Sequence, residues 1–212
     1  MNGNGSARAW CGCTLVKHDT RRVVITGGPG AGKTALLEIV RRHFCEHVLV
    51  LPEAASILFS GGFPRHANDA SRRSGQRAIF HTQTELERMA LDEGGAAVVL
   101  CDRGTVDGIA FWPGDPAEFM RQVGTTREAE LAHYTTVIHL RTPPSGEYNH
   151  KNPLRIESAK EAAAIDERIV AAWSGHPRVF FVDHANKFID KAQRALEIIH
   201  GEIPECCLAH HV

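Results

Sequence analysis

The chain lacks any apolar run close to the roughly 20 residues that a membrane-spanning helix requires. Its start, MNGNGSARAWCGCTLVKHDTRR, has no continuous hydrophobic segment and so does not match a secretory signal peptide. Charge of one sign is not in excess either, because 24 basic and 25 acidic side chains leave a formal net charge of -1. A balanced charge argues against a broad nucleic-acid-binding surface. We therefore expect a cytoplasmic protein with no transmembrane segment and no nucleic-acid partner.

The sequence also lacks the regular cysteine spacing of a disulfide framework. Cys45 and Cys101 fall within an expected helix and an expected strand, which suits reduced thiols. Cys11 and Cys13 lie near the start of the chain. Near its end, Cys206 and Cys207 are followed by His210 and His211. Thiolates and imidazoles are metal ligands, but this spacing matches no common zinc finger. Reduced thiols without a metal are the favoured interpretation, and metal binding is the alternative.

What the sequence does contain is enough hydrophobic material, 43% of 212 residues, for one α/β domain. Short β-branched runs predict strands at Val23–Thr26, His47–Leu51, Ala97–Cys101, Thr136–Leu140 and Val179–Val182. Longer amphipathic stretches predict helices at Lys33–Cys45, Glu53–Phe59, Gly75–Glu93, Pro116–Val123, Thr126–His133, Ser158–Trp173 and Ala185–Gly201. This alternation predicts a five-stranded parallel sheet between two helical layers. We expect an N-terminal extension (1–21), one P-loop domain (22–201) and a C-terminal tail (202–212).

The strongest motif is GGPGAGKT, in which Gly27, Gly32, Lys33 and Thr34 complete the P-loop pattern between a strand and a helix. Glycines permit positive φ values and let phosphate oxygens approach the backbone amides at the positive end of a helix. Lys33 is expected to reach the β- and γ-phosphates, and the Thr34 hydroxyl to coordinate Mg²⁺. The motif predicts ATP or GTP binding by Gly28, Gly30, Ala31, Gly32, Lys33, Thr34 and Ala35.

A second acidic anchor is Asp102, at the end of the apolar strand in AAVVLCDRG. There it would lie at the carboxyl edge of the sheet and hold Mg²⁺ together with Thr34, whereas the alternative role is a helix N-cap. Residue 103 is arginine rather than the second acid of AAA machines. Only one strand separates the P-loop strand from the Asp102 strand, so right-handed crossovers predict the order 2-3-1-4-5 of small nucleotide and nucleoside kinases.

Other candidate catalytic residues follow from their places beside this edge. Glu53, just past the second strand, would orient or deprotonate an acceptor hydroxyl, or would be a first-turn helix acid. Arg103 would contact the phosphates and the acceptor, or would form a structural salt bridge. Gln83 would read an acceptor base or amide, or would be an exposed helix residue.

Two long loops, Ser60–Gly75 and Arg141–Ser158, are typical of lids or binding loops. In the second loop, Lys151 and Arg155 are candidate cations for the transferring phosphoryl group. Candidate contacts to the nucleotide base are Arg141 and Asn186. The chain lacks GTPase signatures, because DRGT is not D-x-x-G and NKFI is not N-K-x-D. This absence favours ATP over GTP.

Several segments together carry a family resemblance: GGPGAGKT, PEAA, QRAIFHTQTELE, CDRGTVDGIAFWPG and HPRVFFVDHANKFIDKAQRAL. From about Arg22 to Gly201, the chain resembles the AAA-labelled P-loop domains that group with the ribosylnicotinamide kinase part of the NAD regulator NadR. A eukaryotic protein that is tied to TRP-channel trafficking and binds GTP and phosphoinositide belongs to the same group. The resemblance implies a kinase-like fold with a magnesium nucleotide at Lys33, Thr34 and Asp102.

Two functional hypotheses remain open at this point. The first is a Mg²⁺-dependent phosphotransferase that passes a γ-phosphoryl group from ATP or GTP to a small hydroxyl acceptor, for example a nucleoside. The second is a nucleotide-dependent switch or slow NTPase whose loops contact a protein or phosphoinositide partner. The arginine-rich stretch Ser60–Arg77 would then meet phosphorylated groups.

Overall fold

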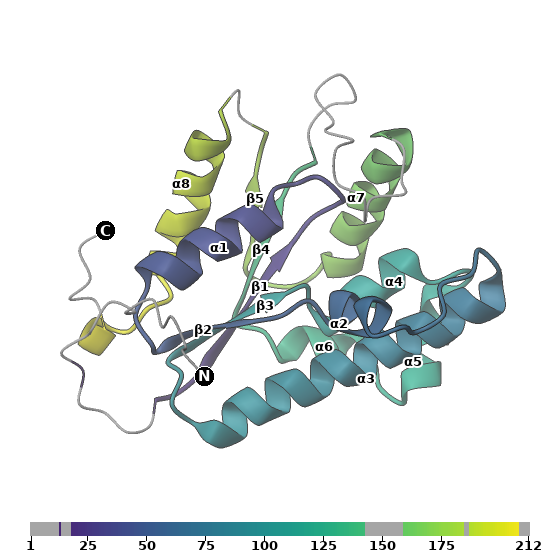
Figure 1. Ribbon diagram of the computed structural model, residues 1–212, viewed down its shortest axis with the longest axis horizontal. Coiled ribbons are helices and arrows are strands. Elements are labelled where there is room, and N and C mark those ends of the chain that lie inside the picture. The colour runs from purple at the N-terminus through teal and green to yellow at the C-terminus, as the bar shows by residue number, and fades with distance from the viewer. Residues whose placement is uncertain (1–12, 14–17, 143–158, 185–186, 208–212) are drawn as a thin grey trace.

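The computed structural model describes residues 13, 18–142, 159–184 and 187–207, and its centre is a five-stranded parallel sheet (Figure 1). The strands lie in the order β2-β3-β1-β4-β5, which confirms the predicted kinase-like order. They are β1 (Arg21–Thr26), β2 (Val48–Leu51), β3 (Val98–Asp102), β4 (Thr136–Leu140) and β5 (Val179–Val182).

The central strand β1 is buried on both faces, which is expected of a parallel sheet whose crossovers place helices on each side. Its residue Val23 pairs with Leu100 of β3 and with Thr136 of β4. Along β1, Val23 and Ile25 pack into one core, while Val24 packs into the other. The period of two in the strand therefore divides the interior between the two helical layers.

Helices α1 and α8 pack in the first core, and α3, α4, α6 and α7 contribute to the second (Figure 1). The helices are α1 (Lys33–His43), α2 (Ala54–Ser60), α3 (Asp69–Glu93), α4 (Gly108–Phe111), α5 (Pro116–Val123), α6 (Arg127–Ala132), α7 (Ala159–Trp173) and α8 (Phe188–His200). Two 3-10 turns, η1 (Thr105–Asp107) and η3 (Glu205–Cys207), complete the described elements.

Helix α3 begins at Asp69 rather than at the predicted Gly75, so the expected loop Ser60–Gly75 is shorter than the sequence suggested. The side chain of Asn68 caps the helix by accepting a hydrogen bond from the Ser71 amide at 2.8 Å. Asp69 adds a favourable negative charge in the first turn. The cap therefore stabilises a helical conformation in the polar segment before Gly75, although apolar residues do not recur there at helical spacing.

Two predicted binding segments fall largely outside the described residues. Of the expected loop Arg141–Ser158, only Arg141 and Thr142 are described, so Lys151 and Arg155 lie outside the described chain. The candidate base contact Asn186 lies outside it as well. Within the described ranges, none of the helices combines the length and apolar character that crossing a bilayer demands.

Candidate functional site

The P-loop between β1 and α1 has a backbone path that only glycine can follow. Gly27, Gly30 and Gly32 have φ values of 135°, 80° and 96°. A Cβ atom on Gly27 would lie 2.1 Å from the Leu140 carbonyl oxygen, and one on Gly32 would lie 2.7 Å from the Phe188 ring. Positive φ and close packing therefore both demand glycine at these turns.

The start of α1 is open to an anion. The amides in the first turn of an α-helix lack intrahelical acceptors and carry the positive end of the helix dipole. At α1 these amides belong to Lys33, Thr34 and Ala35, and this first turn holds no acidic side chain. Gly32 precedes the helix in a left-handed conformation and provides no side-chain cap. The first turn of α1 thus supplies no anion of its own, which fits a site for phosphate oxygens.

Lys33 folds back over the loop that precedes it. Its Nζ atom donates to the carbonyl oxygens of Gly27 at 2.8 Å and of Gly28 at 3.1 Å, and the residue is 9% exposed. Burial, together with the Arg103 charge, lowers the pKa of Lys33 from 10.5 to about 8, although the nearby carboxylate of Asp102 acts in the opposite direction. The ammonium group is therefore poorly solvated and has much to gain from a phosphate partner.

Asp102 ends β3 at the same edge and has a polar atom that the described residues leave unpaired. Its Oδ1 atom is buried and has no hydrogen-bond partner among them. Burial raises the pKa of Asp102, while Lys33 lowers it. The residue is no helix N-cap, because Gly104 holds that position before η1. A buried carboxylate oxygen and the exposed Thr34 hydroxyl are hard oxygen donors, so this donor set fits Mg²⁺.

Arg103 links the site to the P-loop backbone. Its backbone has a φ of 71°, a left-handed conformation that is rare for residues other than glycine. The guanidinium group reaches Glu53 Oε1 at 3.1 Å, the Gly27 carbonyl at 3.2 Å and Asp107 Oδ1 at 3.4 Å. The structure thus shows the salt-bridged arginine that was the alternative reading, and its partners include the phosphate loop itself.

Glu53 precedes α2 and carries an oriented carboxylate. It accepts hydrogen bonds from Arg103 and from the Ser56 hydroxyl, the latter at 2.5 Å. Burial alone would raise the pKa of Glu53, but Arg103, Ser56 and Lys33 together hold it below its usual range. A lowered pKa makes a weak general base. This environment favours an orienting role over proton abstraction.

Asp107 is a buried residue of the site that the sequence reading missed. It is 2% exposed and accepts hydrogen bonds from the Gly104 amide at 3.0 Å and the Trp173 indole at 3.2 Å. It also binds the Thr26 hydroxyl at the end of β1. Asp107 therefore fixes the turn that follows β3. Its contact with Gly104 is local, but Thr26 and Trp173 are remote in sequence, so no local pattern announces those two partners.

Asp166 of α7 is a second missed residue, and it holds the other side of the P-loop. Its Oδ1 atom accepts from the Gly28 amide at 2.9 Å and lies 2.9 Å from His139 Nε2. Arg141 pairs with Asp166 at 3.2 Å and also with Glu167. Arg141 thus lies at the end of β4, as expected, and its guanidinium group is engaged by α7.

Lys191 of α8 is a third residue that the sequence reading missed. Its Nζ atom donates to the carbonyl oxygens of Ala31 at 2.8 Å and Arg141 at 2.5 Å. Burial lowers the pKa of Lys191 to about 8, against the charge of Asp166. This contact joins α8, the P-loop and the end of β4, so the loop is supported from α7, α8 and Arg103.

Gln83 is not the exposed helix residue that was one of the two roles considered for it. It is buried, at 3% exposed, and donates to Glu87 Oε1 at 2.8 Å. It is therefore a buried residue of the interior, which contradicts the exposed alternative, whereas base reading stays a prediction. Two arginines of the basic stretch are also engaged within the fold, because Arg73 pairs with Glu118 and Arg77 bonds the Gln122 side chain at 3.3 Å.

Known proteins support the same fold. The structure resembles a NadR protein in complex with NR, with a TM-score of 0.67 at 14% identity over 87% of this chain and 52% of that one. The present chain thus spans about half the length of that protein. It also resembles thymidylate kinase from Candida albicans, with a TM-score of 0.55 at 14% identity over 86% of this chain and 92% of the kinase.

Sequence comparison gives a family but no curated relative. No curated protein matches the sequence. The model of a family described as AAA domain matches residues 22–190, which is most of the chain. The P-loop geometry, the strand order and this match agree with one another, and the resemblance seen in the sequence is confirmed. The chain belongs to the AAA domain family and has the fold of the P-loop kinases.

Proposed function

We propose that the protein is a Mg²⁺-dependent phosphotransferase that binds ATP or GTP and passes the γ-phosphoryl group to a hydroxyl of a small acceptor, of nucleoside type. The observation that carries the proposal is the Arg103 bridge, which joins the Glu53 carboxylate to the carbonyl oxygen of Gly27 in the P-loop. This bridge ties a hydroxyl-orienting group to the phosphate loop itself. Phosphoryl transfer depends mainly on such positioning and on charge neutralisation.

Each residue of the site has a role that its environment supports. The amides at the start of α1 and the Lys33 ammonium would hold the β- and γ-phosphates. Glu53, kept ionised by Arg103, would accept a hydrogen bond from the acceptor hydroxyl and direct its oxygen. Thr34 and Asp102 would hold Mg²⁺, which supplies charge neutralisation at the phosphate oxygens. Arg155 remains a candidate cation for the transferring group.

The nature of the acceptor is inferred from the neighbours. One solved neighbour is a NadR protein in complex with NR, and the other is a thymidylate kinase. Both share the fold at low identity, so their chemistry guides the choice of acceptors to test. Nucleosides and nucleoside monophosphates are the first candidates.

The test is transfer of phosphate from γ-labelled ATP and GTP, with Mg²⁺, across a panel of nucleosides, nucleotides and small hydroxyl metabolites. We expect one acceptor class to become labelled. Glu53→Gln should reduce the turnover of that acceptor by roughly 100-fold, which is typical of a misplaced reactant. The matched control is Glu85→Gln, an exposed acid on α3. Full turnover by Glu53→Gln would remove the role assigned to Glu53, and hydrolysis without any labelled acceptor would remove the kinase proposal.

One observation favours a second candidate function. The Glu53 and Arg103 side chains are paired with each other, so the same bridge can act as a latch between α2 and the P-loop. In that case the protein would be a slow NTPase and switch that binds a protein or phosphoinositide partner. Co-sedimentation with phosphoinositide vesicles, in the presence of GDP, GTP, ADP or ATP, tests this. Vesicle binding that ignores the nucleotide state would count against a switch.

A further inference from the structure

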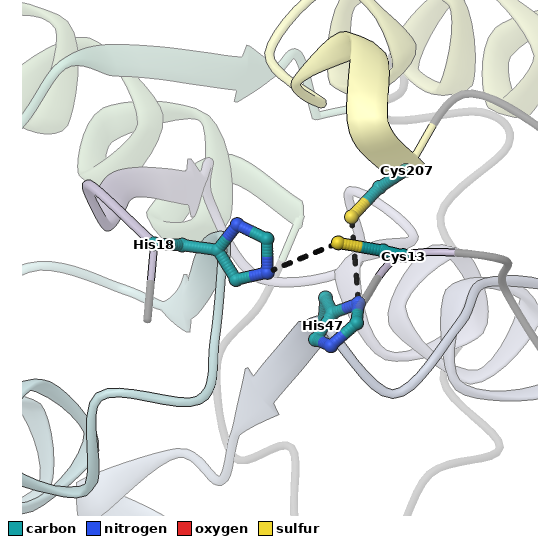
Figure 2. Close-up of side chains that lie close together, drawn as sticks. All are labelled: Cys13, His18, His47 and Cys207. Carbon is teal, nitrogen blue, oxygen red and sulfur yellow. Dashed lines mark hydrogen bonds between the residues drawn. The ribbon is translucent and has the colours of Figure 1, made fainter. Parts of the chain in front are cut away.

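Two cysteines and two histidines meet at the amino end of the sheet. Cys13, His18, His47 and Cys207 each offer one ligand atom, and these four atoms lie within 4.8 Å of one another (Figure 2). The residues come from both ends of the described chain and from the connection between α1 and β2. The sequence singles out Cys13 and Cys207 as potential ligands but gives no sign that His18 and His47 lie beside them. Cys11, His210 and His211, which it also singles out, lie outside the described residues.

The distances match a tetrahedral metal site. With Zn–S near 2.3 Å and Zn–N near 2.0–2.1 Å, two ligand atoms of a tetrahedron are separated by about 3.3–3.8 Å. The Cys13 Sγ atom lies 3.7 Å from His18 Nε2, and Cys207 Sγ lies 3.4 Å from His47 Nδ1. Figure 2 shows the four side chains converging from different segments. Only a small contraction is needed to place all four around one ion.

The surroundings hold these ligands in place. The His47 carbonyl accepts from the amides of Ala97 and Val98 at 2.8 and 3.1 Å, which anchors this residue to β3. Cys207 is 0% exposed, packs in the core beneath α1 and α8, and its amide donates to Pro204 at 2.8 Å. Cys13 packs against the same core. The rings of His18 and His47 lie edge to face, 4.7 Å apart.

Charge also points to a divalent ion. Two thiolates and two neutral imidazoles carry a charge of -2, which one divalent cation cancels, so the filled site is neutral and suited to a partly buried place. Closed sets of four sulfur and nitrogen ligands are the typical structural zinc sites, because no position is left for water or substrate. Softer ligands of this kind disfavour Mg²⁺ and Ca²⁺.

We propose that Cys13, His18, His47 and Cys207 form a structural Zn²⁺ site that fastens both ends of the described chain to the amino end of the sheet. The site is separate from the P-loop, because His18 and His47 precede β1 and β2, whereas the P-loop follows β1 at the opposite edge. It is independent of the proposed kinase activity. Its role is to stabilise the fold.

The experiment uses the full chain, purified with a non-thiol reductant and without added metal. Elemental analysis should find about one zinc per chain. Replacement by Co²⁺ should give the visible bands of tetrahedral coordination and a thiolate-to-cobalt charge-transfer band. Cys207→Ser and His47→Asn should each weaken Co²⁺ binding by at least about 100-fold, since even outer-shell partners contribute about 10- to 100-fold. Zinc removal by a chelator, followed by transfer to chelator-free buffer with Mg²⁺, should lower the melting temperature and leave nucleotide affinity unchanged.

Matched controls are available in the chain. Cys101→Ala removes a thiol of the other core whose pKa is well above the usual range because of burial, and it should keep the cobalt spectrum. His43→Asn removes an exposed histidine of α1 and should keep it as well. If Cys207→Ser does not fold, His18→Asn, at a half-buried position, gives the same readout.

Three results would overturn the proposal. The first is reduced, folded protein that contains no zinc and gives no tetrahedral cobalt spectrum at stoichiometric metal. The second is a Cys13–Cys207 disulfide that persists under reductant in place of the metal. The third is a cobalt spectrum that survives the variants of the four ligands, or that is lost equally in the Cys101→Ala control.

Discussion

At the scale of single residues, Lys33 is a binding group whose burial lowers the stability of the protein when no nucleotide is bound. Its ammonium group is nearly buried and its pKa is lowered from 10.5 to about 8. The unfolded chain therefore binds more protons than the native state between about pH 8 and 10.5, and stability attributable to Lys33 rises with pH across that window. Below about pH 8 the penalty is fully present.

A pH series tests this arrangement at Lys33. We expect the free energy of unfolding of the wild type, relative to that of Lys33→Met, to rise by up to roughly 3 kcal/mol as the pH increases from about 8 to 10.5. Urea denaturation of both proteins at several pH values measures the difference, in which the other titrating groups cancel. A flat or falling difference would show that Lys33 is well solvated in the free protein.

Arg103 gives a second prediction at this scale. Its fork contacts Glu53, the Gly27 carbonyl and Asp107 together, which the single ammonium group of lysine cannot do. Arg103→Lys should lower the free energy of unfolding by about 1–3 kcal/mol. Arg88→Lys, on the exposed face of α3, is the control and should change it by less than about 0.5 kcal/mol. Equal stability of the two variants would contradict the bridging role.

A site residue could be predicted from the sequence only when neighbouring residues in the chain marked it, as in a motif or at the end of a strand. Lys33 and Asp102 were placed correctly at the carboxyl edge, because the motif and the strand end fix them along the chain. Asp107 and Asp166 were missed because their importance lies in contacts with Trp173, Gly28 and other residues remote in sequence. Such pairings become visible only when the strands and α7 are assembled.

At the scale of elements, the P-loop is held by surroundings that leave no room for a side chain. Gly27→Ala would combine a φ of 135° with a Cβ atom 2.1 Å from the Leu140 carbonyl. We expect Gly27→Ala to lower the free energy of unfolding by at least about 2 kcal/mol and to abolish nucleotide binding. Gly95→Ala, which has nothing within 4 Å of its Cβ, is the control and should be nearly neutral. A stable, nucleotide-binding Gly27→Ala protein would show that the loop relaxes easily.

The start of α3 offers a prediction with a conservative partner. Because the Asn68 side chain accepts from the Ser71 amide, Asn68→Ala should cost about 1 kcal/mol and Asn68→Asp should restore most of it. Thermal and urea unfolding of the three proteins measure the effect. A loss in Asn68→Asp as large as that in Asn68→Ala would mean that the cap contributes little.

The sequence predicted the strands well and the short helix α5 residue for residue, but it missed η1 and α4. Buried parallel strands are continuous apolar runs, so β4 and β5 match the prediction residue for residue. The segment Thr105–Phe111 was not predicted as η1 and α4, because it is short, ends in Gly108-Ile109-Ala110-Phe111, and depends on the Asp107 contacts. Local propensity alone does not form so short a helix.

At the scale of the whole molecule, nucleotide binding should appear as added stability. A ligand that binds only the native state at 100 times its dissociation constant adds about 2.7 kcal/mol, which corresponds to roughly 5–10 °C in melting temperature for a chain of this size. We expect this shift with ATP or GTP plus Mg²⁺, a smaller one with chelator, and none in Lys33→Met. Scanning calorimetry measures it, and equal shifts in Lys33→Met would contradict the site.

The meeting of Cys13 with Cys207 has a consequence for how the chain is threaded. Because these two positions are neighbours in space, the backbone between them forms an almost closed ring. A short link could close this ring, so the chain could begin and end at another point along it. A circular permutant in which a short linker joins the chain at Cys13 to the chain at Cys207, with new ends opened in the exposed connection between α2 and α3, should reach the same fold. The fold of this protein would then not depend on the point at which its backbone begins and ends.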